Sequence, residues 1–124
     1  MSTDLASRHC VRYEKGTPPL TRGAAEQLRE QTPNWKFEDD GKAVQRQFTL
    51  KDFKEAIAFV HAVADVAEAE DHHPDILISY RKVTFTLSTH VIGGLSENDF
   101  ILAAKIDRLY QERYASASPS PAGA

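Results

Sequence analysis

Two alternating runs separated by a two-residue connection constrain the fold of this chain more than any other feature. Large apolar or aromatic side chains recur at every second position over residues 76–80 and again over residues 83–87. A period of two is typical of a strand with one buried face. Because only Arg81 and Lys82 separate the runs, the two strands should be antiparallel neighbours. We therefore predict a β-hairpin whose core-facing side chains are Val83, Phe85 and Leu87.

A second hairpin is predicted nearer the N-terminus. Trp35 and Phe37 alternate with a lysine, and the turn-forming residues Asp-Asp-Gly-Lys follow at positions 39–42. The return strand alternates again over residues 44–48. Arg46 lies in the middle of that strand, so the pattern leaves open which of its faces is buried. Trp35 is interpreted as a core residue, since tryptophan is highly buried on average.

Start and stop signals frame three helical segments. Thr21 can cap a short first helix that runs to about Gln31 and stops before Pro33. The second helix is predicted to begin after Thr49, which would serve as the N-cap with Asp52 at position N3. Its predicted core-facing residues recur at helical spacing and are Phe53, Ile57, Val60 and Ala64.

The remaining helix boundaries follow from proline, glycine and serine. The second helix should end near Glu70, because Pro74 disfavours helical geometry at the residue before it. Gly93 and the glycine after it interrupt the strand pattern. Ser96 is then predicted to cap the third helix, with Asp99 at N3 as its capping-box partner. The apolar stripe of this helix is Leu102, Ala103, Ile106, Leu109 and Tyr110.

The predicted order of elements is α-β-β-α-β-β-α. Two hairpins imply an antiparallel sheet of four strands, and the apolar face of that sheet needs a cover that three helices can provide. We therefore predict an α+β fold with three helices packed on one face of a four-stranded antiparallel sheet. Residues 20–114 form the predicted domain, residues 1–19 a flexible lead-in, and residues 115–124 a disordered tail rich in Ser, Pro and Ala.

Composition limits the classes of function. The 124 residues are enough for one domain, 27% of them are charged, and the formal net charge is -3, so we expect no nucleic-acid partner. No apolar stretch is long enough to span a membrane, and the first residues lack the apolar core of a secretory signal. The lone Cys10 is interpreted as an inert thiol in a reducing, cytoplasmic setting.

Three of the five histidines lie close to carboxylates in the second half of the chain. Residues 68–74 read Glu-Ala-Glu-Asp-His-His-Pro, and His90 and Asp99 follow. Imidazole gives and takes protons near neutral pH, so this cluster favours general acid–base chemistry or a metal site. If the strand continues to His90, strand parity places this residue on the sheet face of Thr86 and Ser88, which the core does not fill.

Each of these residues also has a purely structural interpretation. His72 and His73 could be exposed loop histidines, because adjacent side chains diverge in extended backbone and the following proline restricts a bend. His90 could be a surface residue at a strand end. Asp99 at N3 could serve only to stabilise the helix N-terminus, and Glu68 could belong to a solvated helix face. The residues alone leave both interpretations open.

Several motifs taken together resemble one family. They are the run Glu-x-x-Asp-His-His-Pro from Glu68, an aromatic residue at Tyr80, Leu-Ser-Thr-His ending at His90, and Gly-Gly-Leu-Ser-Glu-x-Asp-Phe-Ile-Leu-Ala from Gly93. This combination is similar to the pterin-4a-carbinolamine dehydratases. The resemblance begins near Leu20, ends near residue 109, and implies the fold predicted above.

The resemblance also implies a reaction. It is the dehydration of 4a-hydroxytetrahydropterin to quinonoid dihydropterin, which recycles the pterin after aromatic amino-acid hydroxylation. Histidine general acid–base catalysis would carry this step, with no cofactor and no metal. A homodimer or homotetramer, and a functional link to an aromatic amino-acid hydroxylase, are implied as well.

The site residues are implied by the same motifs. His72 and His90 would donate protons on the two faces of the ring, and His73 would bind the pterin and act as base. Asp99 and Glu68 would orient the imidazoles or ring nitrogens. The predicted catalytic set is His72, His73, His90 and Asp99. The predicted substrate-binding set is Glu68, Asp71, Pro74, Ser88 and Thr89.

Two features qualify the resemblance. Ile76 stands where many members of the family carry an aromatic residue, which concerns substrate fit or subunit contact more than chemistry. Trp35 matches a family aromatic near the pterin site.

Two alternatives to catalysis also stay open: a non-catalytic dimerisation or assembly module on the same fold, and a zinc site of three histidines and a carboxylate. Adjacent histidines rarely direct both rings at one ion, so the metal site is the weaker alternative.

Overall fold

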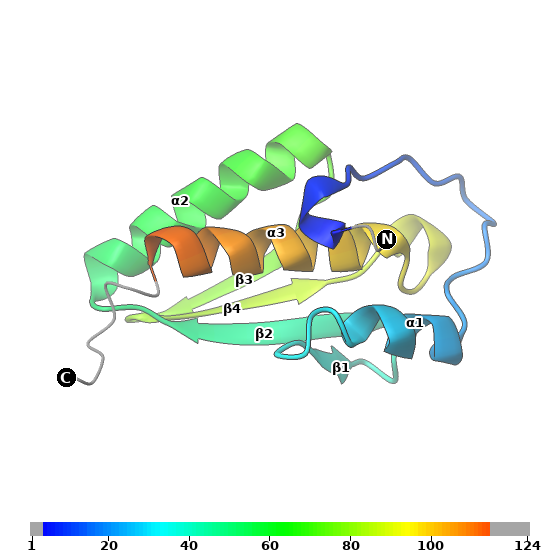
Figure 1. The fold of residues 1–124 in the computed structure, drawn as a ribbon, viewed down its shortest axis with the longest axis horizontal. Coiled ribbons are helices and arrows are strands. Elements are labelled where there is room, and N and C mark those ends of the chain that lie inside the picture. Colours follow the sequence, from blue (N-terminus) through cyan, green and yellow to red (C-terminus); the bar gives the residue numbers. More distant parts are fainter. Residues whose placement is uncertain (1–3, 115–124) are drawn as a thin grey trace.

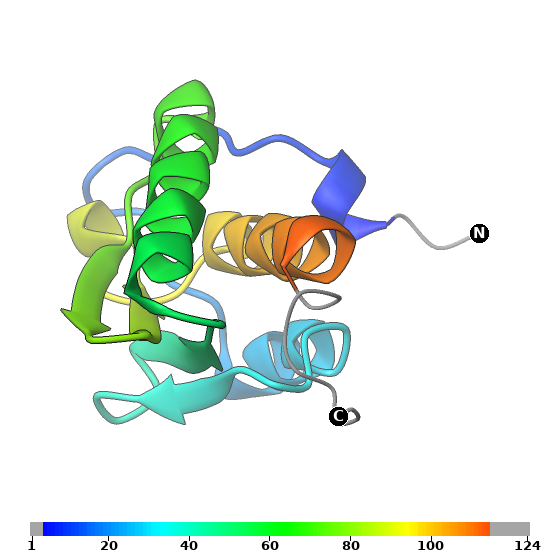
Figure 2. The same cartoon turned by 90° about the vertical axis from the view of Figure 1, so that its left-hand side faces the viewer.

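The computed structural model describes residues 4–114 as a four-stranded antiparallel sheet covered on one face by three α-helices (Figures 1 and 2). The strands lie in the order β1-β2-β4-β3. Their bounds are β1 Lys36–Glu38, β2 Ala43–Thr49, β3 Asp75–Ser79 and β4 Lys82–Leu87. The helices are α1 Arg22–Arg29, α2 Phe53–Glu70 and α3 Glu97–Arg113. The predicted α+β class and element order are confirmed.

The core lies between the sheet and helices α2 and α3. The alternating side chains of β4 are fully buried there, as the pattern predicted, and Phe85 packs edge-to-face on Phe48 of β2 and Phe59 of α2. Burial of each such side chain stabilises the fold by about 1.5–3 kcal/mol. Helix α3 contributes Leu102, Ala103 and Ile106, all inaccessible to solvent.

Arg46 faces the helices. Its guanidinium lies over the ring of Phe48, 4.1 Å from the ring centroid, and Nη1 contacts Oδ1 of Asp107 in α3 at 2.7 Å. The indole N–H of Trp35 donates to the same oxygen at 2.8 Å. Burial raises the pKa of Asp107, and the hydrogen bond from the indole and the charge of the guanidinium offset only part of this effect. Trp35 is therefore a core residue tied to α3.

The start of α2 differs from the prediction. Asp52 caps the helix, its carboxylate accepting the N–H of Glu55 at 2.8 Å, and Thr49 is not the cap. Thr49 still pairs with Lys82 in the β2–β4 ladder, so it belongs to the sheet. The strand continues to this residue because β4 supplies partners for its backbone.

The buried face of α2 also differs from the prediction. The buried residues are Ala56, Phe59, Val63 and Ala67. Phe53 and Ile57, which were expected in the core, are 49% and 42% exposed. The helix is turned by about one residue, or 100°, from the predicted orientation. Phe59 stacks against aromatic rings of β2, β4 and α3, and this contact explains the turn.

The hairpin β3–β4 turns at Tyr80 and Arg81, one residue earlier than expected. Tyr80 has a positive φ of 57°, a left-handed conformation that a non-glycine residue adopts mainly in turns. All five residues of β3 are exposed, and this strand lies at the edge of the sheet. The edge strand therefore leaves one row of backbone hydrogen-bonding groups without a partner strand in the described chain.

The N-terminal segment crosses α3 before it reaches α1 (Figure 1). It contains one 3-10 turn, Leu5–Ser7, whose Leu5 side chain is buried in the core. Lys105 of α3 donates to the carbonyl of Ala6 at 2.9 Å. The flexibility predicted for residues 1–19 and the predicted domain boundaries stay predictions, and the predicted tail lies outside the described residues. None of the described helices has the length and apolar character needed to cross a membrane.

Candidate active site

The N-terminus of α3 holds a buried carboxylate. Ser96 caps the helix and Asp99 at N3 completes the predicted capping box, its Oδ2 accepting the N–H of Ser96 at 3.0 Å. A capping box needs only a serine and an acid three residues apart, which is why it could be predicted locally. The side chain of Asp99 is nevertheless 0% exposed, so the carboxylate does more than cap a surface helix.

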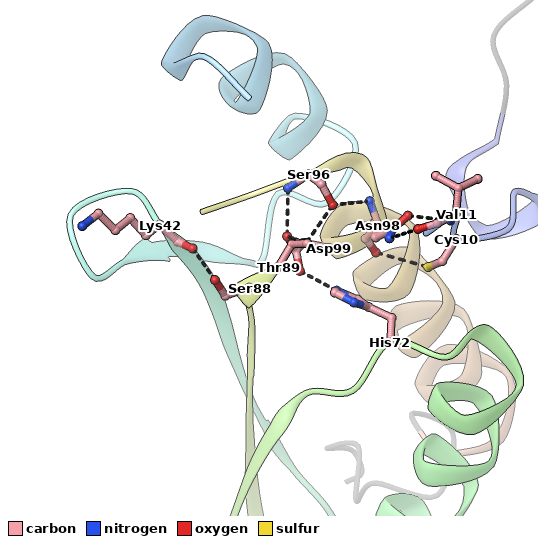
Figure 3. A network of polar contacts seen from close by, with 9 residues as sticks. All are labelled: Cys10, Val11, Lys42, His72, Ser88, Thr89, Ser96, Asn98 and Asp99. Carbon is pink, nitrogen blue, oxygen red and sulfur yellow. Dashed lines mark hydrogen bonds and ion pairs between the residues drawn. The ribbon is translucent and has the colours of Figure 1, made fainter. Parts of the chain in front are cut away.

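His72 supplies the second partner of this carboxylate. Its Nε2 lies 2.7 Å from Oδ1 of Asp99, although the two residues are 27 positions apart (Figure 3). An ionised carboxylate only accepts hydrogen bonds, so Nε2 carries the hydrogen. Thr89 donates to Oδ2 of the same carboxylate at 2.8 Å, and its hydroxyl also lies 2.7 Å from the hydroxyl of Ser96. Three donors therefore hold Asp99.

This arrangement leaves Nδ1 of His72 as the free ring nitrogen. The residue is 9% exposed, and it lines a hollow of about 340 Å³ together with Asp71, Thr89 and Val91. A buried imidazole whose other nitrogen donates to a carboxylate is held in one tautomer and one orientation. Nδ1 is then an acceptor that can take a proton, and the protonated ring can return one.

A reversal of the backbone after helix α2 brings His72 to Asp99. Helix α2 ends at Glu70, and Asp71 follows in the left-handed conformation, with φ 54°. The N–H of His72 then donates to the carbonyl of Ala67 at 3.2 Å. This reversal turns the ring of His72 toward α3 (Figure 3), and Pro74 follows before β3 begins. Asp71 lines the hollow, whereas Pro74 is not among its lining residues.

His73 and Glu68 form a separate, exposed pair. Nε2 of His73 lies 2.7 Å from Oε2 of Glu68, and the two side chains are 53% and 77% exposed. The structure thus pairs two of the predicted imidazoles with the two predicted acids, His72 with Asp99 and His73 with Glu68, a pairing that the sequence left open. Only the first pair is buried.

His90 and Ser88 line a different hollow, of about 350 Å³, which also contains Thr86 and Asp75. Strand β4 ends at Leu87, so the strand does not continue to His90 as the parity argument required, although His90 still lines the same hollow as Thr86 and Ser88. His90 is exposed and begins a 3-10 turn, His90–Ile92. Ser88 donates to the carbonyl of Lys42 at 2.8 Å. Thr89 and Val91, the alternate residues, line the hollow of His72.

Comparison with known proteins decides the family. Residues 18–109 match the family described as pterin 4 alpha carbinolamine dehydratase. The chain belongs to this family. It is 47% identical over 105 residues to a protein of Halorhodospira halophila named "Putative pterin-4-alpha-carbinolamine dehydratase", covering 85% of this chain and 96% of that one. A relative with the same name from Nitrosospira multiformis is 46% identical, covering 87% and 94%.

Solved structures of dehydratase-like proteins are similar as well. The crystal structure of a transcriptional coactivator/pterin dehydratase from Brucella melitensis superposes with a TM-score of 0.70 at 33% identity, covering 73% of this chain and 97% of that one. A pterin dehydratase-like protein identified as a RuBisCO assembly factor in the alpha-carboxysome gives 0.54 at 25% identity, covering 61% and 88%. The fold thus occurs in proteins described with different roles.

Several residues of this dehydratase-family site were missed by sequence reasoning. Asn98, Glu70 and residues 10–13 line the hollow of His72, and none belongs to a predicted site. The only local signal was an asparagine and a glutamate at the ends of capped helices, which is a common and unspecific pattern. Cys10 lies here too; burial and the neighbouring Glu70 raise the pKa of its thiol to about 12. A thiol that stays protonated is a poor nucleophile.

Donor geometry for a metal is not present at this site. Within residues 4–114, no cluster of three or more His, Cys, Asp or Glu side chains is arranged to hold an ion. The geometry instead suits proton transfer: one imidazole with a fixed tautomer beside a hollow, and two more exposed imidazoles nearby in the sequence motif.

Proposed function

We propose that this chain catalyses the dehydration of 4a-hydroxytetrahydropterin to quinonoid dihydropterin. The observation that carries the proposal is the buried contact of His72 with Asp99 at 2.7 Å, on the wall of an open hollow. A histidine needed only for packing has no requirement for a buried carboxylate partner beside a hollow. Membership of the dehydratase family supplies the substrate class.

The reaction needs two proton transfers. The lone pair of ring nitrogen N5 expels the hydroxyl at C4a, and a proton from an imidazolium converts the departing hydroxide into water. A neutral imidazole takes the proton of N5, so the enzyme regains the proton that it donated. General acid–base catalysis of this kind supplies about 10²–10⁴-fold. In this scheme neither metal nor cofactor takes part.

His72 acts as a proton donor in this proposal, held by Asp99. His90, which lines the other hollow, acts on the opposite face of the ring, and His73 binds the pterin and serves as base. The exposure of His73 and His90 is compatible with a substrate that completes their orientation on binding. Asp99 and Glu68 orient the imidazoles through their contacts with His72 and His73.

The predicted binding residues take more limited roles. The hydroxyls of Ser88 and Thr89 both donate to protein acceptors, so in this proposal these residues offer the pterin edge backbone groups. Asp71 supports the substrate from the wall of the hollow of His72, and Pro74 limits the backbone freedom of the preceding histidine pair.

The decisive experiment is the rate of 4a-carbinolamine decay with purified protein and with His72→Ala, His73→Ala and His90→Ala variants. We expect acceleration by the wild type and loss of rate in the variants, greatest for His72. An unaltered rate in all three variants contradicts the catalytic assignment. Inactive wild-type protein with normal folding contradicts the function.

The finer expectations about cellular context belong to the same proposal. We expect a cytoplasmic homodimer or homotetramer that serves an aromatic amino-acid hydroxylase. The exposed edge strand β3 and the turn after it support self-association, since Leu77 and Tyr80 are 65% and 67% exposed. Light scattering of wild-type and Leu77→Lys protein tests this expectation.

A non-catalytic assembly module is the second candidate. The exposed side chains of β3 favour it, and so does the similarity to the pterin dehydratase-like protein identified as a RuBisCO assembly factor. The buried His72–Asp99 contact argues against it, because a scaffold gains nothing from a fixed imidazole beside a hollow. Partner capture together with no dehydratase activity would favour the module.

A further inference from the structure

The N-terminal segment forms one wall of the hollow that contains His72. We define the strap as residues 8–13. Four strap residues line the hollow, and they are Cys10, Val11, Arg12 and Tyr13. The family match begins only at residue 18, so the motifs that identify the family do not account for this wall.

Asn98 clamps the strap at its centre. Its side chain is buried, with the residue 4% exposed, and it exchanges two hydrogen bonds with one strap residue. Oδ1 accepts the N–H of Val11 at 3.0 Å, and Nδ2 donates to the carbonyl of Val11 at 2.6 Å (Figure 3). Departure of the strap would leave both buried amide atoms without these partners, which is costly.

Glu70 clamps the neighbouring part of the strap. Its side chain is 8% exposed, and its carboxylate accepts the N–H of Cys10 at 2.7 Å and contacts Nδ1 of His9 at 2.8 Å. Lys105 of α3 lies 3.5 Å away. Arg8 pairs with Glu97 at the beginning of α3. The strap is therefore attached at three successive points to the helices that carry the site.

The bonding within the pterin determines which part of the substrate lies near this wall. Under the dehydration proposed above, on which this inference rests, C4a and N5 of the pterin lie against His72. N5 is also bonded to C6, the carbon that carries the pterin substituent. The substituent is thus within two bonds of the atoms that react, and it falls in the hollow that the strap encloses.

We propose that Arg12 and Tyr13 are specificity-determining residues that contact the C6 substituent of the pterin and select among substituents. Among the described residues lining this hollow, Arg12 alone has a permanently charged cationic side chain. Its guanidinium donates to oxygen atoms, and the half-buried ring of Tyr13 packs against the substituent chain. The preferred substrates are therefore pterins with hydroxyl or carboxylate oxygens on the C6 substituent, over those with a plain methyl group.

The test compares two carbinolamines, one with a 6-methyl group and one with a 6-(1,2-dihydroxypropyl) group. We expect wild-type protein to have the higher kcat/KM for the dihydroxypropyl substrate, through KM. Arg12→Ala should reduce this preference about tenfold, as expected for one lost hydrogen bond to a charged donor. Tyr13→Phe retains the ring and should preserve most of the preference, whereas Tyr13→Ala should reduce it.

Lys15→Ala is the matched control for charge. It removes a positive side chain three residues further along the segment, and Lys15 does not line the hollow. A preference that survives Arg12→Ala, or that falls equally in Lys15→Ala, overturns the role of the strap while leaving the dehydratase activity in place. Wild-type protein without activity on either substrate overturns the proposed function and this inference together.

A second pair of variants tests the clamp through the backbone of Val11. Val11→Ala shortens an exposed side chain and keeps the backbone N–H, so it is the reference for Val11→Pro, which removes the N–H that Asn98 accepts. Val11→Pro should raise KM for the dihydroxypropyl substrate several-fold, keep kcat, and speed trypsin cleavage after Arg12. Identical KM in the two variants, with cleavage faster in Val11→Pro, shows that a loosened strap is irrelevant to binding and contradicts the inference.

Discussion

His72 and His90 occur in one motif set, yet they lie in opposite environments. His72 is 9% exposed and its ring is held against a fully buried carboxylate. His90 is exposed, and its ring makes no hydrogen bond to another described residue. The first imidazole is therefore oriented before any ligand arrives, whereas no such contact fixes the second. Under the proposed function, one histidine is preorganised by the fold and the other is oriented by substrate.

The largest expected effect comes from the preorganised imidazole. His72→Ala should lower kcat by about 10²–10³-fold, because it removes an oriented proton-transfer group. His90→Ala should lower kcat less and raise KM, because the ring is positioned only when substrate binds. Steady-state decay of the carbinolamine measures both parameters. His61→Ala is a matched control, since this histidine is exposed on α2, and its rate should equal that of wild type.

Asp99→Asn should have the next largest effect. The carboxylate accepts from His72, Thr89 and Ser96, and an amide replaces one acceptor oxygen by a donor. We expect a loss of about 1–3 kcal/mol in unfolding free energy. The amide N–H can donate to Nε2 of His72 and so favours the tautomer with the hydrogen on Nδ1. The value of kcat should therefore fall even at temperatures at which the variant is folded. Urea denaturation and histidine ¹⁵N chemical shifts check the two effects, and an unchanged tautomer contradicts the role of Asp99.

Thr89→Val is a smaller perturbation of the same network. It removes the hydroxyl that donates to Asp99 at 2.8 Å while preserving side-chain shape. The expected cost is about 1 kcal/mol in unfolding free energy, with a modest decrease in kcat. Ser88→Ala is the comparison variant, because its hydroxyl contacts only the carbonyl of Lys42. If both substitutions cost the same, the buried network has no special contribution.

The smallest expected effect concerns the pH dependence of the strap. Burial tends to raise the pKa of Glu70, but the Cys10 N–H, His9 and Lys105 outweigh burial and lower it. A lowered pKa means that the ionised carboxylate stabilises the fold above its ordinary pKa, about 4.3, and that this stability is lost as pH falls. Unfolding free energy should therefore decrease less steeply in acid for Glu70→Gln. Parallel curves for the two proteins would contradict the contribution of Glu70.

Local patterns predicted most of the fold correctly. The start of α3 followed from Ser96 and Asp99, because a capping box involves residues only three apart. The β3–β4 hairpin followed from alternation and a short connection. Each of these features depends on interactions between near neighbours, so the information lies within a few residues.

The face of α2 could not be predicted in this way. Residues Phe53 and Ile57 mark one apolar stripe, and Ala56, Phe59 and Val63 mark another beside it. Both stripes have helical spacing, so periodicity does not distinguish them. The aromatic rings of β2, β4 and α3 around Phe59 select the second stripe, and those residues are distant along the chain.

The candidate site also combines features that the sequence predicted with features that only the structure shows. The residue types came from the sequence, whereas the pairing of His72 with Asp99 and the clamp between Asn98 and Val11 came from tertiary structure. The clamp joins residues that are 87 positions apart, and no local pattern marks such a contact. Missed residues of this kind are therefore expected wherever a loop from one end of the chain covers a site built at the other.

For this protein, amino-acid order alone was sufficient for the strands, the helix caps and the set of imidazoles and acids. These properties arise from backbone preferences and side-chain chemistry over a few residues. Folding in three dimensions was needed to choose which helix face is buried, which imidazole is fixed in one tautomer, and which segment encloses it. Those choices depend on packing and on burial of polar groups, which are defined only when distant parts of the chain meet.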